Sequence, residues 1–209
     1  MNHAQVTARE GTSADISRNA IETEIAHASG TYFVECFDKD GNLKWTDTIE
    51  NAVTTEGKNA ALTHFFSGSA YTASHFMGLI ESTGYGYAGA NGSGVAATNI
   101  ATSITAAGGA SPANGWNEAT SSMCASRGTP SFAAASAGSR ALSSAIAFSI
   151  IATCTIKGCF MMCKSVAAVA CVATVGSTAG MIYSAGLFTG GDKALSNGDT
   201  LSVSYTASL

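Results

Sequence analysis

The chain has 209 residues, of which 11% are charged and 46% are hydrophobic, and its formal net charge is -4. This length fits one large domain, or one domain and an arm, and it can bury a core without metals or disulfides. No basic stripe accompanies the net negative charge, so we expect no nucleic-acid partner.

Charged residues are concentrated in the N-terminal part of the chain. Residues 1–60 hold ten of the 14 acids and five of the ten bases, so residues 61–209 hold only four acids and five bases. Typical soluble domains contain roughly 25% charged residues. Either the surface is rich in uncharged polar residues, or much of it is buried against other subunits, because charge is depleted at interface cores.

Residues 1–30 are polar and contain few large apolar side chains, among them Ile16, Ile21 and Ile25. These three isoleucines form only a weak stripe, so we expect an arm that becomes ordered against a partner. The start of this segment lacks a basic region followed by an apolar one, so we expect no signal peptide and synthesis in the cytoplasm. The folded domain is predicted to occupy residues 31–209.

A β-hairpin is predicted at the start of that domain. Thr31–Phe37 is rich in β-branched and aromatic residues, which favours a strand. Asp38–Asn42 contains the turn pair Asp-Gly, and Leu43–Ile49 alternates as a return strand. A calcium loop would need Glu where Ile49 stands, so the turn interpretation is preferred.

A short helix is predicted after the hairpin. Thr54 or Thr55 can cap its N-terminus, and Leu62, Phe65 and Phe66 recur on one face. This is the only helix that the pattern predicts.

A long loop, Glu81–Ala97, follows a predicted strand at Ser74–Ile80. Its letters match a dinucleotide-binding pattern, but more glycine follows instead of a helix, and no acid follows at the required distance. We therefore expect no cofactor. Tyr85 and Tyr87 in this loop are predicted to make surface contacts.

The C-terminal half is predicted to consist mainly of short strands. The expected strands are Phe132–Ala135, Ala141–Ile151, Met181–Phe188 and Thr200–Thr206, with a turn at residues 137–139 and a strand or close-packed turn at Val166–Val175.

The stretch Phe148–Cys163 has apolar residues or glycine at every even position and mixed residues at the odd ones. This period of two predicts two strands, or one that bends near Gly158, with the even face toward the core. On such a strand Cys159 and Cys163 face outward and Cys154 faces inward.

Four of the six cysteines lie within 18 residues, and three interpretations stay open for them. Reduced, partly buried thiols fit a chain without a secretion signal. Disulfides between or within subunits are the second interpretation, with candidates Cys124, Cys159, Cys163 and Cys171. The spacing of Cys159 and Cys163 also fits a metal loosely, but no second close pair completes a tetrahedral set, so no metal site is predicted.

No catalytic constellation is recognisable. His64 and His75 lack a carboxylate or serine placed to form a triad. The four acids beyond residue 60 are Glu81, Glu118, Asp192 and Asp199. A carbohydrate-active enzyme would need two carboxylates flanking a cleft, so this alternative is disfavoured. Ala145–Val175, the most apolar stretch, is interrupted by two lysines, so no membrane helix is expected.

Together these features predict a mainly β domain, a β-sandwich or jelly-roll-like fold with one short helix and an extended N-terminal arm.

Five short segments, in this order, resemble a family of small virion proteins from tailed bacteriophages. They are Phe37–Trp45, Asn51–Asn59, Met77–Ile80, Trp116–Ala119 and Gly198–Thr206. The cysteine cluster and the long Gly/Ala/Ser loops depart from the family pattern.

The resemblance implies a head decoration (cement) protein, a non-enzymatic homo-oligomer on the capsid exterior. Its partners would be the major capsid protein and copies of itself, and disulfides could form once the particle leaves the reducing cytoplasm. The alternative is a tail component or a receptor-binding fibre protein.

Overall fold

Ten strands and one helix are present in the residues that the computed structural model describes, which are 28–66, 75–82, 117–119, 123–124, 126–163, 171–176 and 180–209. In chain order the elements are β1 (Ser29–Phe37), β2 (Leu43–Val53), α1 (Thr55–Phe66), β3 (Phe76–Glu81), β4 (Asn117–Glu118), β5 (Ser139–Ala141), β6 (Ile146–Ser149), β7 (Cys154–Cys163), β8 (Met181–Leu187), β9 (Lys193–Leu195) and β10 (Thr200–Ser208).

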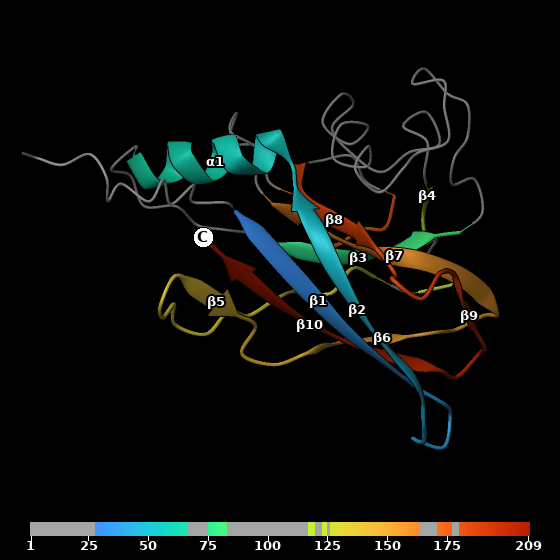
Figure 1. Cartoon of the computed structure of the whole chain (residues 1–209). Coiled ribbons are helices and arrows are strands. Elements are labelled where there is room, and N and C mark those ends of the chain that lie inside the picture. The colour runs from blue at the N-terminus through green and yellow to red at the C-terminus, as the bar shows by residue number, and fades with distance from the viewer. Residues whose placement is uncertain are drawn as a thin grey trace, which may run out of the picture.

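The strands pack as two antiparallel layers, which confirms the predicted sandwich. One layer contains β2, β1 and β10, with β5 and β6 both paired to β10. The other contains β4, β3, β7 and β8, and β9 continues the line of β8 along β7. The layers join at one corner, where the last residues of β2 pair with β8. Helix α1 lies across the end of the sandwich at this corner (Figure 1).

Tyrosines connect the two layers inside the core. Tyr32 of β1 is fully buried, and its hydroxyl shares a 2.7 Å hydrogen bond with Ser184 Oγ of β8. Its ring packs against Tyr205 of β10 at 4.6 Å. Because a buried hydroxyl needs a partner, these contacts hold the layers in one relative position.

The predicted hairpin is confirmed. Asp38 Oδ1 accepts hydrogen bonds from the backbone N–H groups of Asp40 and Asn42, each at 2.9 Å. Gly41 adopts the positive φ, 82°, that glycine tolerates in such a turn. The two strands that flank the turn pair in one register from Ser29 to Cys36 on β1, and the register shifts between Cys36 and Phe37.

The predicted helix is also confirmed, and Thr54 is its cap. Thr54 Oγ1 accepts the Gly57 N–H at 2.8 Å and donates to the Ile182 carbonyl at 2.6 Å, which fastens the helix to β8. The far end of α1 is different, because Phe65 and Phe66 are 80% and 76% exposed there.

The stretch Phe148–Cys163 forms two strands, as predicted, but the predicted facing of its last residues is wrong. Ile80 pairs with Gly158 and Glu81 with Ile156, so Lys157 is an extra, bulged residue. The bulge shifts the alternation by one, and Cys159 and Met161 therefore share the inter-sheet core with Ile156.

The remaining strands follow the sequence pattern with smaller differences. Met181–Phe188 and Thr200–Thr206 correspond to β8 and β10, and Leu201, Val203 and Tyr205 share the buried face as predicted. Phe132 makes only an isolated bridge, to Leu142, instead of belonging to a strand. The short strands β4 and β9 were not predicted. The proposed arm ends earlier than expected, because Ser29 and Gly30 belong to β1, and Glu81 of the proposed loop belongs to β3. Residues 1–27 of the arm, and the part of the loop with Tyr85 and Tyr87, lie outside the described residues.

We predict that Gly158→Ala destabilises the domain by about 1–3 kcal/mol, the range for overpacked sites. A Cβ on Gly158 would lie 2.0 Å from the Gly186 carbonyl oxygen, a backbone atom that no rotamer change can move. Urea unfolding measures the effect, and Thr155→Ala, exposed on the same strand, is the matched control. Equal unfolding free energies for the two variants would contradict this account of the close packing between Gly158 and β8.

Candidate functional site

A cavity of about 570 Å³ lies between α1 and the end of the sandwich. This volume falls in the range of roughly 300–1,000 Å³ that is usual for ligand sites. Its described lining comes from α1, both sheets and the segment before β5: Gly57, Ala60, Ala61, Phe65, His75, Pro130, Phe132, Arg140, Met161, Cys163, Tyr183, Tyr205 and Ala207. We call it the α1 pocket.

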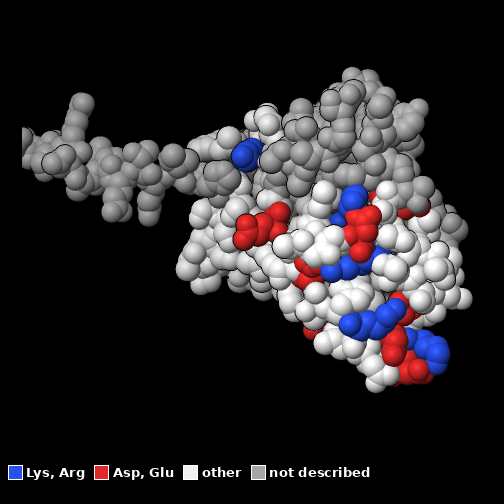
Figure 2. Space-filling view, turned by 45° about the vertical axis from the view of Figure 1, so that its right-hand side comes forward, with Lys and Arg blue, Asp and Glu red and all other residues white. Residues whose placement is uncertain are grey.

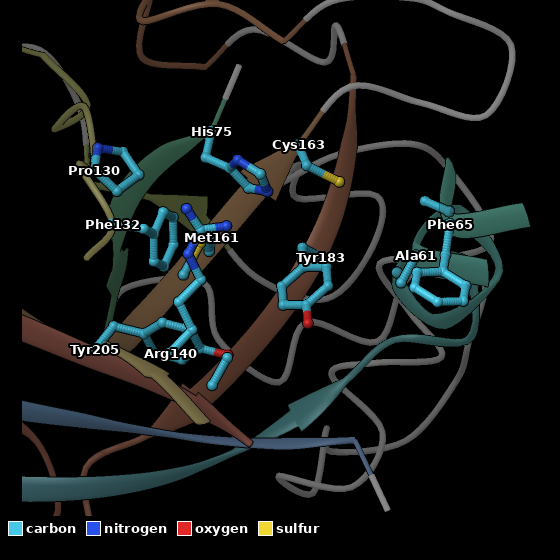
Figure 3. A pocket seen from close by; sticks show the side chains of 13 residues that line it. Ala61, Phe65, His75, Pro130, Phe132, Arg140, Met161, Cys163, Tyr183 and Tyr205 are labelled. Atoms are coloured by element: carbon cyan, nitrogen blue, oxygen red, sulfur yellow. The ribbon is translucent and has the colours of Figure 1, made fainter. Parts of the chain in front are cut away.

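The walls of the α1 pocket are mostly aromatic and aliphatic. Figure 3 shows Arg140, Phe132 and His75 together on one side, and Phe65 and Ala61 of α1 on the other, with Tyr183 between them. The ring of His75 lies 5.6 Å from that of Phe132 and 6.3 Å from that of Tyr183. Such a surface buries apolar groups of a ligand favourably.

Arg140 supplies the one cationic group among the described lining residues. Its guanidinium lies over the ring of Phe132, 5.4 Å from the ring centre, and its Nε donates to the Ala133 carbonyl at 2.9 Å. Within the described part of the chain it forms no ion pair. The positive charge at this rim is therefore available to an anionic ligand group.

Three other titratable side chains of the α1 pocket, His75, Tyr183 and Tyr205, are neutral at pH 7. Burial, aided by the charge of Arg140, lowers the pKa of His75 to about 4. Burial raises the pKa of Tyr183 to about 12. None of the described lining residues is acidic, so they offer no carboxylate for general acid or base catalysis. The arrangement suits binding of an apolar group with a negative charge beside it.

The α1 pocket was not predicted from the sequence. His75 was found to lack partners for a triad, and Phe132, Arg140 and Tyr183 were assigned to no site. One feature of the sequence could have indicated this site. Leu62, Phe65 and Phe66 share one face of the predicted helix, and all three are exposed in the structure.

All six cysteines are buried free thiols, including Cys124, Cys159, Cys163 and Cys171. The expectation that Cys159 and Cys163 face outward is therefore wrong, because the bulge turns Cys159 into the inter-sheet core and Cys163 packs with Ala60 and Met181. Burial raises the pKa of Cys36 to about 11, and it also raises the pKa of Cys159. A thiol that resists ionisation is a poor nucleophile. The disulfide hypothesis remains a prediction without support from this geometry.

A second charged cluster is structural. The guanidinium of Arg127 donates two 2.7 Å hydrogen bonds to the carboxylate of Glu118, and both side chains are almost fully buried. Arg127 also donates to the Val172 carbonyl, and Glu118 accepts the Gly176 N–H. This pair fastens the segment at residues 171–176 to the outer face of the β3–β7–β8 sheet.

Two of the other acids named from the sequence, Asp192 and Asp199, are also paired. Asp192 lies against Lys157, and Asp199 lies 2.6 Å from Lys44. Figure 2 shows red and blue side chains next to one another in the lower right part of the view, while much of the remaining described surface is uncharged. Among the described residues, no three His, Cys, Asp or Glu side chains are grouped to hold a metal ion.

Within the described residues, no helix has the length and apolar character to span a membrane. The predicted interface residues Ile16, Ile21, Ile25, Tyr85 and Tyr87 all lie outside the described residues.

Comparisons with protein-family models, with curated proteins and with solved structures find no match.

We predict that Arg127→Met lowers the free energy of unfolding by about 3–5 kcal/mol, because Glu118 is left as an unpaired buried charge. Combining it with Glu118→Gln should recover part of the loss. Urea unfolding measures both. Lys39→Met is the control, since the Lys39–Asp40 pair is exposed and should contribute less than about 1 kcal/mol. Equal losses from Arg127→Met and Lys39→Met would contradict this role.

We predict that stability falls as the pH drops from about 6.5 to about 4. The pKa of His75 is lowered to about 4 in the folded state, so in this window the unfolded state binds more protons. Each unit of pKa difference corresponds to ~1.4 kcal/mol, so His75 lowers the free energy of unfolding by at most about 3 kcal/mol across this window. Urea unfolding across this window should lose that part of its pH dependence in His75→Gln. An unchanged pH profile in the variant would contradict the assignment to His75.

Proposed function

We propose that the chain is a virion structural protein that binds the outside of an assembled bacteriophage head and stabilises it. Its partners are the major capsid protein and further copies of itself. The resemblance of five short segments to head decoration proteins suggests the family, and the surface of the domain supports a docking role.

The observation that carries the proposal is the exposed face of α1. Leu62, Phe65 and Phe66 are 57%, 80% and 76% exposed, and the two phenylalanine rings contact each other edge to face. Aromatic side chains are enriched at protein interfaces, and a group of them exposed beside an apolar pocket marks a contact surface. The absence of acids from the described pocket lining favours docking over catalysis there.

The mechanism is thermodynamic. A protein that binds the assembled lattice and not its separated subunits stabilises the lattice by mass action. Many copies on a symmetric shell add modest individual interfaces into a large total. The buried thiols give no reason to invoke covalent links, so the proposed contacts are non-covalent.

The test uses heads that lack this protein. Purified chain should co-sediment with such heads, fail to bind dissociated capsid subunits, and raise the temperature at which the heads release their contents. Phe65→Ser/Phe66→Ser should weaken binding to heads at least tenfold, as expected for aromatic residues at an interface centre. Phe33→Ser is the matched control, because Phe33 is an exposed phenylalanine on β1.

Two results would contradict the proposal. One is labelling of the protein in intact particles at the tail alone, which would favour the tail or fibre alternative. The other is equal affinity for heads and for dissociated subunits, because such binding would not stabilise the assembled state.

A further inference from the structure

We infer that the α1 pocket is the binding site for the N-terminal segment, residues 14–27, of a second copy of this chain. The inference deepens the proposed function and rests on it for the expectation that copies lie side by side. Three observations carry it: where the described chain begins, the chemistry of the pocket, and the chemistry of the segment.

The described chain begins at the end of the sandwich that contains the pocket. Gly30 on β1 pairs with Ala207, and Ala207 lines the pocket. β1 is paired on both sides as far as Ser29, so the chain enters the sheet from beyond this end. The 27 residues that precede the described part can extend to roughly 90 Å at ~3.3–3.6 Å per residue, which is enough to reach a neighbouring copy.

The pocket offers apolar walls and one uncompensated positive charge. Phe65, Phe132 and Tyr183 supply aromatic surface, and Arg140 lies at the rim without an ion pair in the described residues. Lys58, exposed on α1, likewise forms no ion pair there. A matching ligand would place an apolar side chain in the cavity and a carboxylate beside it.

The N-terminal segment has this chemistry in its sequence. Its isoleucines each have an acid as an immediate neighbour: Asp15–Ile16, Ile21–Glu22 and Glu24–Ile25. Residues 1–27 contain four acids and two bases, so the segment is negative where the pocket rim is positive. Charge complementarity of this kind sets the register and the partner of an interface.

The proposed function favours a second copy as the occupant. A contact between the pocket of one copy and the segment of another is heterologous, and such contacts build rings or open arrays. Such an array is what a protein on a symmetric shell requires. The segment of one copy would bind in the α1 pocket of its neighbour.

The test is complementation between two variants of the full chain, followed by sedimentation without any heads. The pocket variant is Arg140→Glu, which repels the acids of the segment, and the segment variant is Ile21→Ser/Ile25→Ser. The wild-type chain should self-associate as its concentration rises, and each variant alone should associate at least tenfold more weakly. Equal urea midpoints show that both variants are folded.

The mixture of the two variants decides the inference. The segment of the pocket variant is intact and so is the pocket of the segment variant, so the mixture should form dimers with one contact and nothing larger. Leu43→Ser, which removes an exposed side chain on β2, should associate like wild type.

Three outcomes would overturn the inference. The wild-type chain could stay monomeric, the two variants could associate as strongly as wild type, or the mixture of the two variants could fail to form dimers. A monomer whose segment resists protease until Arg140→Glu is introduced would place the segment in its own pocket instead. Head binding is measured separately, so a chain that binds heads but does not self-associate would leave the proposed function standing and remove only this inference.

Discussion

The hydrogen bond between Tyr32 and Ser184 is the contact on which the rest of the structure depends. Both side chains are fully buried, so neither hydroxyl has water as an alternative partner. The bond joins β1 in one sheet to β8 in the other, and Tyr205 packs against it while accepting a hydrogen bond from Asn51 at 3.2 Å. Tyr205 and Tyr183, the neighbour of Ser184, both line the α1 pocket. The polar network that spaces the sheets therefore also shapes the candidate site.

Most of the strands could be predicted because their patterns are local. Alternation in Thr200–Thr206 predicts one buried face, and Leu201, Val203 and Tyr205 occupy it. The Asp-Gly pair and the capping threonine likewise act on backbone within a few residues. The period of two fails at Lys157, because a bulge depends on how β7 pairs with β3, and that pairing joins segments about 80 residues apart.

The candidate site could not be predicted for the same reason, on a larger scale. Its walls come from α1, β5, β7, β8 and β10, and no local pattern records that Gly57, Arg140 and Ala207 meet. The close approach of α1 to β8 also leaves no local trace: a Cβ on Gly57 would lie 2.6 Å from the Tyr183 carbonyl oxygen. The composition contained one relevant signal. Because residues 61–209 hold only nine charged side chains, parts of the surface were expected to carry no charge.

The distribution of charge is the physical basis on which we propose docking for this domain. Of the four acids beyond residue 60, Glu118, Asp192 and Asp199 are each held by a base of the same chain, whereas Glu81 is buried without an ion pair in the described residues. Carboxylates used in this way stabilise loops and are unavailable for proton transfer. Arg140 differs from these side chains. Its guanidinium lies over the ring of Phe132 and forms no ion pair with an acid among the described residues. An unpaired cation beside exposed aromatic side chains is the arrangement on which the proposed docking role rests.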